Sequence, residues 1–275
     1  MSKPSIGIIG GGVVGGAVKN FFEDAKVYDK YKDLDSIEEV AKRRFIFICV
    51  PTPFRGELDL SAVSDAVANA VSHLANPQDQ LIVIKSTTLP GKTQAYQDKY
   101  PHANFAFNPE FLRDKTAKED FMNNDRQIVG YTTKTKNHPL VKELLEILPR
   151  APYEKIMPAQ DAEMIKYAGN TFLALQVIFA NQINDVCQAA GISYELVKES
   201  IKADKRVGKS HWEIFHTESS LANNMSDAYR GYGGKCFPKD INSLIVEGRR
   251  LGVDFSLFEV GREINMELNG GQYDQ

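Results

Sequence analysis

A glycine-rich turn near the start of the sequence constrains the fold more than any other feature. An apolar run at residues 5–9 leads into GGGVVG at residues 10–15, which has the spacing G-x-G-x-x-G. Apolar residues at helical spacing predict a helix over residues 13–23, and a second short strand at residues 25–29 ends in Asp29. This order of strand, glycine turn, helix, strand and acid predicts the first βαβ unit of a dinucleotide-binding fold.

Each glycine of the G-x-G-x-x-G pattern has a separate structural role in such a unit. Gly10 makes the tight turn, Gly12 lets the backbone approach a pyrophosphate, and Gly15 lets helix and strand pack closely. The N-terminus of the following helix faces the phosphate charge. A structural βαβ turn without any ligand is the alternative. The predicted cofactor contacts of this turn are Gly10, Gly12, Val13, Val14 and Gly15.

The acid at the end of the second strand bears on the choice of cofactor. Asp29 lies about 20 residues after Gly10, where a carboxylate accepts hydrogen bonds from the ribose of an adenosine. A carboxylate at this place repels a 2′-phosphate, so we predict NAD rather than NADP. Lys30 and Lys32 lie close by and weaken this preference.

More strand-like segments follow, separated by helical stretches such as residues 62–74, at the spacing of βα units. This alternation predicts a Rossmann-like α/β domain with a doubly wound parallel sheet. Ligands of such sheets bind beyond the carboxyl ends of the strands. The further predicted strands are Phe45–Val50, Leu81–Lys85, Phe105–Asn108 and Ile128–Tyr131.

Three of these predicted strands end in polar turns. The sequence has PTP at residues 51–53, STT at residues 86–88 and NPEFL at residues 108–112. Each could be ordinary turn chemistry, because Pro, Ser, Thr and Asn are common in turns. Three polar ends at one edge of one sheet favour a ligand instead. Further predicted cofactor contacts are Pro51, Thr52, Ser86 and Thr87.

The pattern changes to long helices after Pro158. We therefore predict two domains, an NAD-binding domain at residues 1–157 and an all-helical central domain at residues 158–275. The central domain would carry catalytic residues and the dimer contact. The predicted helices of this part are residues 162–190, 194–202, 240–251 and 255–268.

The first of these helices carries a polar group. Glu163, Lys166 and Asn170 lie three and four residues apart, so all three project on one face. A lysine on a helix is usually solvated. An asparagine one turn later, on an otherwise apolar surface, favours a polar site.

The run GYGGKCFPKD at residues 231–240 carries the strongest chemical signal of the chain. Cys236 follows closely spaced glycines and precedes Lys239 and Asp240. Glycines permit positive φ and a close approach to a ligand. Nearby positive charge or a helix N-terminus favours the thiolate form of a cysteine. A buried structural cysteine is the alternative, but the glycines and charges favour a nucleophile.

Composition argues against several classes of protein. A formal net charge of −3 gives no basic surface for nucleic acid, and no stretch reaches the about 20 apolar residues of a membrane span. The sequence shows no signal-peptide pattern. Three widely spaced cysteines predict neither a disulfide framework nor a zinc site, and the five histidines lack metal-ligand spacing. We therefore expect a cytoplasmic protein without a bound metal.

Ordered motifs from Gly10 to about Asn265 resemble those of the UDP-glucose/GDP-mannose dehydrogenase family. They are GGGVVG, PTP, KSTTLPG, NPEFL, AEMIKYAGNTFLA, KRVG and GYGGKCFPKD. The resemblance implies a Rossmann-like NAD-binding domain followed by a helical central domain. It also implies that the 6-hydroxymethyl group of a nucleotide sugar is oxidised twice, to a carboxylate.

The resemblance gives roles to the candidates of the second half. It implies that Cys236 is the nucleophile that holds the substrate as a thiohemiacetal and then as a thioester. Lys166 and Asn170 would stabilise oxyanionic states. Asp240 would orient water or support the lysine and the cysteine.

The same resemblance gives roles to the turns of the first half. Glu110 would be the general base or water activator, and Thr87 would hold the water. Phe111 and Leu112 would offer backbone groups to the nucleotide sugar, and Glu110 would also contact it.

Further implied substrate contacts come from the second half. Tyr232, Gly233 and Gly234 would line the sugar pocket, and Arg206 would reach the substrate of a neighbouring subunit. We expect a homodimer, since symmetric dimers are the commonest oligomers and the last predicted helix has an apolar side for a two-fold mate. The residues of that side are Phe255, Phe258, Val260 and Ile264.

The chain also departs from the family. Full-length members have a third, C-terminal domain that holds the nucleotide, and nothing in this sequence corresponds to it. A natural minimal enzyme, a truncated one and one completed by another chain are the three explanations. The stretch at residues 209–230, with Trp212, is long for a loop, so it either closes over a ligand or is a surface insertion. Lys235 stands where a smaller residue is usual.

UDP-glucose, oxidised to UDP-glucuronate, is the favoured substrate, and another UDP or GDP sugar is the alternative. A different class of function is a catalytically impaired or regulatory NAD-binding protein that lacks its nucleotide-sugar domain. A one-step β-hydroxyacid dehydrogenase is a third possibility. Such an enzyme needs no cysteine nucleophile, so Cys236 argues against it.

Overall fold

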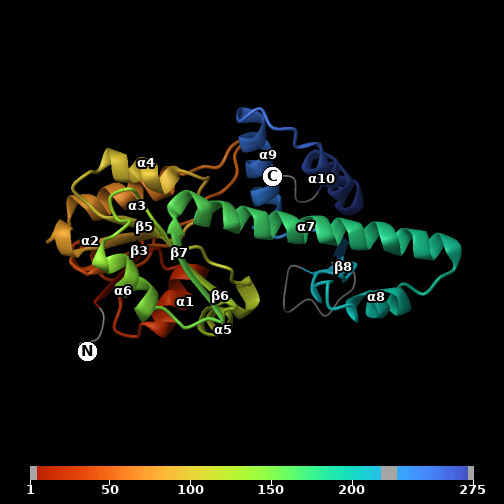
Figure 1. Ribbon diagram of the computed structural model, residues 1–275, viewed down its shortest axis with the longest axis horizontal. Helices are drawn as coiled ribbons and strands as arrows, with labels where there is room; N and C mark the ends of the chain where they lie inside the picture. Colours follow the sequence, from red (N-terminus) through yellow and green to blue (C-terminus); the bar gives the residue numbers. More distant parts are fainter. Residues whose placement is uncertain (1–4, 218–227, 272–275) are drawn as a thin grey trace. The chain divides into compact units, whose positions relative to one another are not determined.

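The structure is a computed structural model that describes residues 5–217 and 228–271. The chain forms two compact units. The first contains the residues up to Pro53 and residues 58–166, and the second contains residues 54–57 and the residues from Tyr167 onward. The long helix α7 (Ala159–Ala190) contributes to both units (Figure 1). The predicted domain boundary after residue 157 stays a prediction.

A seven-stranded sheet forms the centre of the first unit. Its strands are β1 (Ile6–Ile9), β2 (Lys26–Tyr28), β3 (Phe45–Ile48), β4 (Leu81–Ile84), β5 (Phe105–Phe107), β6 (Arg126–Tyr131) and β7 (Tyr153–Pro158). They lie in the order β2-β1-β3-β4-β5-β6-β7. The Rossmann-like α/β fold class is confirmed, and β1 to β5 run parallel as predicted.

The expectation of a wholly parallel sheet is wrong at its far end. β6 is antiparallel to β5, and β7 is parallel to β6, so the sheet is mixed. The segment between β5 and β6 holds one short helix, α5 (Ala117–Met122). Phe121 of this helix packs edge to face on Phe21, at 5.8 Å between ring centroids, instead of carrying the chain back across the sheet.

Helices fill the segments between the strands of the first unit. They are α1 (Val13–Phe21), α2 (Ile37–Ala41), α3 (Ser61–Ser72), α4 (Lys92–Lys99), α5, α6 (Pro139–Ile147) and the short 3₁₀ turns η1 (Pro77–Asp79) and η2 (Asp114–Thr116). Local sequence explains several of these bounds. α2 begins with a capping box between Ser36 and Glu39, and Pro139 stands at the first turn of α6.

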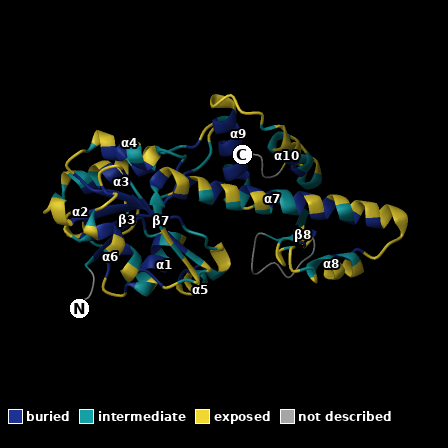
Figure 2. Cartoon of the chain, in the orientation of Figure 1, coloured by how far each residue is buried: buried dark blue, intermediate teal, exposed yellow. Residues whose placement is uncertain are grey.

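Helices cover both faces of the sheet, because successive strand residues point to opposite sides. Ile8 of β1 packs in a core with α1, α5 and α6, whereas Ile9 packs in a second core with α3, α4 and the start of α7. Figure 2 shows the inner strands of the sheet as buried and the outer helix surfaces as exposed. Burial on both faces explains why the strand sequences are continuous apolar runs.

The predicted strands agree with the observed ones to within one or two residues at each end. One strand of this sheet, β7, was missed. It lies at the sheet edge next to β6, and its residues are exposed or only half-buried. Such a strand has neither an apolar run nor a clean alternation, so its sequence carries no clear strand signal.

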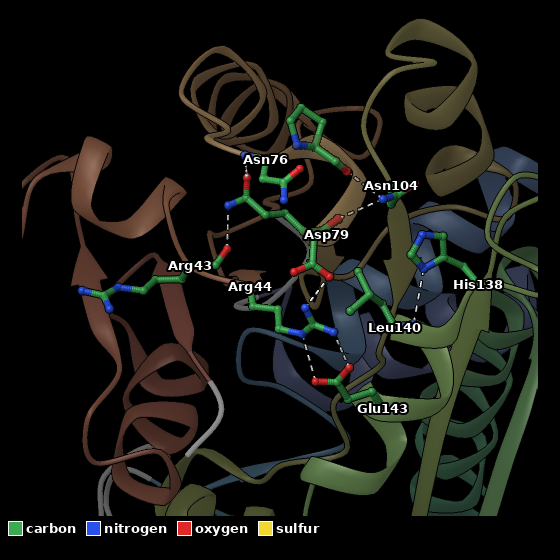
Figure 3. A network of polar contacts seen from close by, with 10 residues as sticks. Arg43, Arg44, Asn76, Asp79, Asn104, His138, Leu140 and Glu143 are labelled. Atoms are coloured by element: carbon green, nitrogen blue, oxygen red, sulfur yellow. Dashed lines mark hydrogen bonds and ion pairs between the residues drawn. The ribbon is translucent and has the colours of Figure 1, made fainter. Parts of the chain in front are cut away.

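Polar contacts join several segments at the amino-terminal edge of the sheet (Figure 3). Nε and Nη2 of Arg44, which precedes β3, donate to the two carboxylate oxygens of Glu143 on α6 at 3.0 and 2.7 Å. Nη1 of Arg44 pairs with Asp79 of η1. The amide of Asn104, before β5, donates to the carbonyl of Gln80 before β4 at 3.1 Å. These contacts lie at the edge opposite to the predicted ligand site, so we assign them to stability.

The described part of the second unit is mostly helical, but its small strand pair departs from the expected all-helical domain. It contains α7 from Tyr167 on, α8 (Tyr194–Lys202), α9 (Phe237–Arg250), α10 (Ser256–Asn269) and the small antiparallel pair β8 (Phe215–His216) and β9 (Tyr229–Arg230). One core joins Ala174 and Val177 of α7 to Ile241 of α9. A second core joins Cys187 of α7 to Trp212.

Two expectations for this unit change. Trp212 is buried and its Nε1 donates to the carbonyl of Gly208 at 2.8 Å, so the start of the 209–230 stretch packs on the core and is no surface insertion. Residues 218–227 lie outside the described residues, so closure over a ligand stays a prediction.

The second change concerns the apolar side expected for a dimer contact on α10. Phe255, Phe258 and Ile264 pack against the first core of the second unit, because α10 lies on α9 there. Of the four residues expected on that side, only Val260 is exposed, at 52%.

Candidate active site

The register of the sheet brings four chain segments to one edge. The last paired residues of β1, β3, β4 and β5 lie side by side, and they are Ile9, Ile48, Ile84 and Phe107. The residues that follow them lead into the turns singled out in the sequence, and they are Gly10, Cys49, Lys85 and Asn108. This is the edge at which doubly wound sheets bind their ligands.

The three glycines of the turn have the geometry that a dinucleotide requires. Gly10 has φ of +105°, and a Cβ there would lie 2.4 Å from the carbonyl oxygen of Cys49. A Cβ on Gly15 would lie 1.9 Å from the carbonyl oxygen of Gly10, so helix and strand touch at this point. A Cβ on Gly12 would meet no described atom within 4 Å, which leaves this face open for a pyrophosphate.

Asp29 stands beside this turn. Its Oδ2 accepts a hydrogen bond from the Gly11 N–H at 2.7 Å, and its Oδ1 accepts one from the Tyr31 N–H at 3.0 Å. Burial raises the pKa of Asp29, but these two hydrogen bonds and the charge of Lys32 outweigh it and hold the pKa below its usual value. The side chain is thus an anion fixed next to the glycine turn, which fits the ribose of NAD.

A pocket opens at the same edge. It is lined by Val14 of α1 and by residues that follow β3, β4 and β5, namely Cys49, Val50, Pro51, Thr52, Lys85, Ser86, Thr87 and Glu110. Four of the predicted contacts from the strand ends therefore share one pocket with Val14 and Glu110. The hydroxyl of Ser86 donates to the carbonyl of Val50 at 2.7 Å and accepts from its N–H at 2.9 Å. The Ser86 side chain therefore fastens the pocket wall.

Glu110 and Lys166 form a buried ion pair. Nζ of Lys166, on α7, lies 2.7 Å from Oε1 of Glu110, and the two side chains are 5% and 11% exposed. The other carboxylate oxygen accepts the Leu112 N–H at 2.8 Å. Burial raises the pKa of Glu110, but Lys166 and the Leu112 N–H outweigh it and lower the pKa below its usual value. The site therefore holds an ionised carboxylate and an ammonium group in contact.

Glu163, one turn before Lys166 on α7, has a structural role. Its carboxylate is fully buried and accepts hydrogen bonds from the Thr88 hydroxyl, the Gly91 N–H and both the N–H and hydroxyl of Thr93, at 2.6 to 3.1 Å. These donors lie between β4 and the first turn of α4. Glu163 therefore fixes the start of α7 to the turn that carries Thr87.

In the second unit, a polar cluster surrounds Asp240. This residue is completely buried in the first turn of α9, and its Oδ2 accepts a hydrogen bond from Nδ2 of Asn170 at 2.6 Å. Lys239 pairs with Oδ1. Asn170 lies four residues after Lys166 in the continuous helix α7. Of the predicted group, Asn170 and Asp240 are thus joined by a direct hydrogen bond within the second unit.

Cys236 is the residue directly before α9. It is half-buried, whereas the other two cysteines, Cys49 and Cys187, are buried. Burial raises the pKa of the Cys49 thiol to about 12, which makes that thiol inert. The positive end of a 14-residue helix favours a thiolate at Cys236. Gly231 and Gly234 before it have φ of +77° and +72°, as expected for this turn.

The remaining predicted substrate contacts differ in their surroundings. The guanidinium of Arg126 covers the Phe111 ring at 3.8 Å from its centroid. Arg206 is 89% exposed and pairs with Asp204. The Tyr232 ring is 3% exposed within the core, and a Cβ on Gly233 would lie 2.7 Å from the Tyr229 side chain. Contacts of these residues with a sugar stay predictions.

Sequence reasoning missed Lys85, and it named Glu163 and Lys239 without the partners that define their roles. Lys85 lines the pocket, Glu163 fastens α7, and Lys239 pairs with Asp240. Lys85 was recognisable as a charge directly after an apolar strand, and Glu163 as an acid on the face of Lys166. Their partners are distant in sequence, which hid their roles.

No helix of the described residues combines the length and the apolarity needed to cross a lipid bilayer. Among residues 5–217 and 228–271, no group of three or more His, Cys, Asp or Glu side chains is arranged to hold a metal ion.

Two family models match the chain. Residues 17–148 match the NAD binding domain of the UDP-glucose/GDP-mannose dehydrogenase family, and residues 160–267 match the central domain of the same family. The first match contains every pocket residue except Val14 and most of the sheet, and the second contains Lys166, Asn170, Cys236 and Asp240. The first unit is therefore an NAD-binding domain, in agreement with the glycine turn and Asp29.

Individual relatives agree with these matches. A UDP-glucose 6-dehydrogenase of Rickettsia prowazekii is 36% identical over an alignment of 214 residues that covers 75% of this chain and 46% of the relative. UDP-glucose 6-dehydrogenase AglM of Haloferax volcanii is 30% identical over 252 residues, 86% of this chain and 55% of the relative. The chain thus spans about half the length of these curated relatives.

A solved structure shows the same architecture. The UDP-glucose dehydrogenase of the archaeon Pyrobaculum islandicum superposes with a TM-score of 0.79 and 26% identity, covering 96% of this chain and 68% of that one. Sequence, fold and the two successive domain matches lead to one conclusion: the chain belongs to the UDP-glucose/GDP-mannose dehydrogenase family.

Proposed function

We propose that this chain oxidises the 6-hydroxymethyl group of a nucleotide sugar to a carboxylate in two NAD-dependent steps, with Cys236 as the covalent nucleophile. The observation that carries the proposal is the position of Cys236. It directly precedes the first turn of α9, whose buried Asp240 is held by Asn170 and Lys239. An enzyme that stops at the aldehyde needs no thiol, whereas a second oxidation needs the intermediate to stay attached.

The first oxidation breaks the C6–H bond, and the hydride leaves with both electrons of that bond. NAD, when bound, accepts the hydride in this oxidation and in the next. We assign Glu110 as the base that takes the hydroxyl proton, directly or through a water held by Thr87, because its carboxylate is ionised beside Lys166. Lys166 stabilises the negative charge that develops on the oxygen.

The covalent steps then use Cys236. Its thiolate forms a bond to the aldehyde carbon, and Lys166 and the second N–H of Asn170 stabilise the oxyanion. Protonation gives the thiohemiacetal, and loss of its hydroxyl proton together with the second hydride, which carries both electrons of the C–H bond, gives a thioester. Water that Glu110 deprotonates attacks the thioester, the C–S bond breaks, and the thiolate is restored. One hydroxymethyl group, two NAD and one water thus give one carboxylate, two NADH and three protons.

The proposed substrate is UDP-glucose and the product UDP-glucuronate. The names of the curated relatives support this choice, as does the similarity to the Pyrobaculum structure. Another UDP or GDP sugar is the alternative. We also propose that the protein acts in the cytoplasm as a homodimer, with Arg206 serving the substrate of the mate and Tyr232, Gly233, Phe111 and Leu112 serving its own.

The proposal is tested by counting NADH per sugar. We expect absorbance at 340 nm to show two NADH for each UDP-glucose consumed, and slower or no reaction with other UDP and GDP sugars. The Cys236→Ala variant is expected to form no uronate. Cys187→Ala, which removes a buried cysteine on α7, is the control and is expected to keep the stoichiometry.

Complete oxidation by Cys236→Ala would refute the covalent mechanism. The competing hypothesis of a non-catalytic NAD-binding protein makes a different prediction. In that case calorimetry detects NAD binding, but neither NADH formation nor affinity for any nucleotide sugar is found.

A further inference from the structure

We propose that Lys85 is a positioning residue for Glu110: it holds the Asn108–Glu110 turn in the place from which the carboxylate contacts Lys166. The inference rests on the proposed function for what Glu110 does in the reaction. The position of Glu110 itself can be measured without any activity.

Lys85 is an unusually buried cation. It follows β4 directly and is 3% exposed. Its Nζ donates to Oδ1 of Asn108 at 2.7 Å and lies 3.5 Å from the carbonyl oxygens of Asn108 and Pro109. The ring of Phe121 lies 5.3 Å away. A buried charge needs polar partners, and the oxygen partners of Lys85 all belong to the turn that leads to Glu110.

Asn108 connects this contact to the other side of the turn. It is fully buried, and its Nδ2 donates to Oε1 of Gln127 at 3.0 Å and to the carbonyl of Ile128 at 2.7 Å. The backbone pairing of β5 with β6 ends at Phe107, so the Asn108 side chain continues the connection to β6. Because both N–H groups of the Asn108 amide donate to β6, its Oδ1 is free to accept the hydrogen bond from Lys85. The turn is thus held from β4 on one side and from β6 on the other.

Glu110 follows two residues later, and its two oxygens contact Lys166 and the Leu112 N–H. Movement of the turn would break both contacts. The titratable groups that face Lys85 are the Cys49 thiol, Glu110 and Lys166. Burial lowers the pKa of Lys85 to about 8; Cys49 and Glu110 oppose this effect, and Lys166 adds to it. The positive charge that attracts the turn is therefore lost as the pH rises through 8.

Hydrogen exchange provides a test that is independent of catalysis, because the Leu112 N–H donates to Glu110. We expect Lys85→Met to accelerate exchange in a peptide covering residues 109–113 at least about tenfold at pH 7, as a local opening does. Peptides from β1 should exchange as in the wild type. In the wild type, protection of residues 109–113 relative to the intrinsic rate should fall above pH 8. Lys142→Met, which removes an exposed lysine of α6, is the matched control.

The kinetic arm separates positioning from general loosening. We expect Lys85→Met to lower kcat about 10- to 100-fold with little change in KM for NAD, as a misplaced catalytic group does. The ratio of wild-type to variant kcat should shrink above pH 8, where the wild-type lysine loses its charge. If Lys85 had only a structural role, the ratio of wild-type to variant kcat would not depend on pH. Measurements from about pH 6.5 to about pH 9.5 bracket the pKa of Lys85 and decide this.

Unchanged exchange of residues 109–113 in Lys85→Met overturns the inference, and so does a kcat ratio independent of pH. If the wild type forms no NADH, the proposed function fails, and the exchange measurement still decides the position of Glu110. Should Lys85→Met not fold, Lys85→Gln, which keeps an N–H donor without the charge, is expected to show the same faster exchange. If neither variant folds, Lys85 is a folding determinant and the inference is wrong.

Discussion

Asn170 donates a 2.6 Å hydrogen bond from its side-chain amide to Oδ2 of Asp240, and this contact joins α7 to the first turn of α9. Asp240 is completely buried, and Lys239 is the partner of its other carboxylate oxygen. A buried carboxylate is costly unless it is paired. The bond therefore fixes two residues of the proposed active site and supports the fold of the second unit at once.

Replacing Asn170 by Ala should destabilise the protein. The variant leaves one oxygen of Asp240 buried without its donor, so we expect the free energy of unfolding to fall by about 1–3 kcal/mol. Urea denaturation followed by circular dichroism measures this change. Asn123→Ala, at an exposed position after α5, is the control. An unfolding free energy equal to that of the wild type would show that the bond contributes nothing to stability.

The local parts of this architecture were predictable from sequence. The unit from β1 to β2, with its glycines and Asp29, and the helical face of Lys166 and Asn170 depend on spacing within one or two elements. Pairing across the chain was not predictable in the same way. Asn170 and Asp240 are 70 residues apart, and no periodicity indicates which side chain meets which.

The direction of β6 was missed for a related reason. An apolar run predicts a strand, but parallel and antiparallel strands buried on both faces have the same composition. The direction depends on whether the preceding segment crosses the sheet, and here that segment packs its helix α5 on α1. Lys85 was hidden likewise, since its partner Asn108 is 23 residues away.

Replacing Gly12 or Gly15 of the turn by alanine should affect NAD binding and stability differently. Gly12→Ala meets no described atom, so we expect an unchanged melting temperature together with at least about tenfold weaker NAD binding, about 1.4 kcal/mol. Gly15→Ala meets the carbonyl of Gly10, so it should lose at least about 1–3 kcal/mol of stability, as overpacked sites do. Calorimetry with NAD and thermal unfolding measure both. A Gly12→Ala variant that binds NAD like the wild type would contradict the proposed path of the pyrophosphate.

The ion pair of Glu110 and Lys166 predicts a specific dependence of stability on pH. The pKa of Glu110 is lower in the folded chain than in the unfolded one, because Lys166 and the Leu112 N–H outweigh the raising effect of burial. Ionised Glu110 therefore contributes fully to the stability of the fold when the pH is above its ordinary pKa of about 4.3. This contribution is lost as the pH falls through the lower pKa of Glu110 in the folded chain. At pH 7 we expect Glu110→Gln to be less stable by up to about 3–5 kcal/mol, because it leaves Lys166 buried without its partner.

The difference between wild type and Glu110→Gln should begin to shrink below about pH 4.3 and should close as the pH falls through the lower pKa of folded Glu110, because the carboxylate is then protonated in the wild type as well. Urea titrations from pH 7 to pH 3, in steps of about one unit, measure this closure. Glu146→Gln, which removes an exposed acid of α6, is the control with little effect at any pH. A constant difference over the whole range would mean that the ionised carboxylate is not the stabilising form.

The three cysteines should react with iodoacetamide in a defined order. Cys236 is half-buried at the start of α9, and Cys49 and Cys187 are buried. Burial raises the pKa of the Cys49 thiol to about 12, so almost no thiolate exists there at pH 7. We expect mass spectrometry of the native protein to find Cys236 carboxamidomethylated first and all three cysteines modified in urea. Modification of Cys49 before Cys236 would contradict the assignment of the nucleophile.

The last prediction concerns the homodimer, for which the exposed residues of α7 suggest a surface. Phe172, Phe179 and Val186 recur every seven residues on one side of this helix and are 65%, 50% and 63% exposed. Such a stripe is typical of a helix that packs against another helix, and exposed apolar patches of this kind are uncommon in monomers. We expect light scattering to give twice the chain mass of 30.7 kDa for the wild type.

A double variant, Phe172→Glu with Val186→Glu, should give the monomer mass, because the introduced carboxylates would lose their hydration in the contact. It leaves the Phe179 ring on Trp212 untouched, so circular dichroism should show a folded chain. Val260→Glu, on α10, is the control and should remain dimeric. If Val260→Glu dissociates and the double variant does not, α10 rather than α7 forms the contact. A wild type of monomer mass would refute the homodimer, and the role of Arg206 toward a mate would be lost with it.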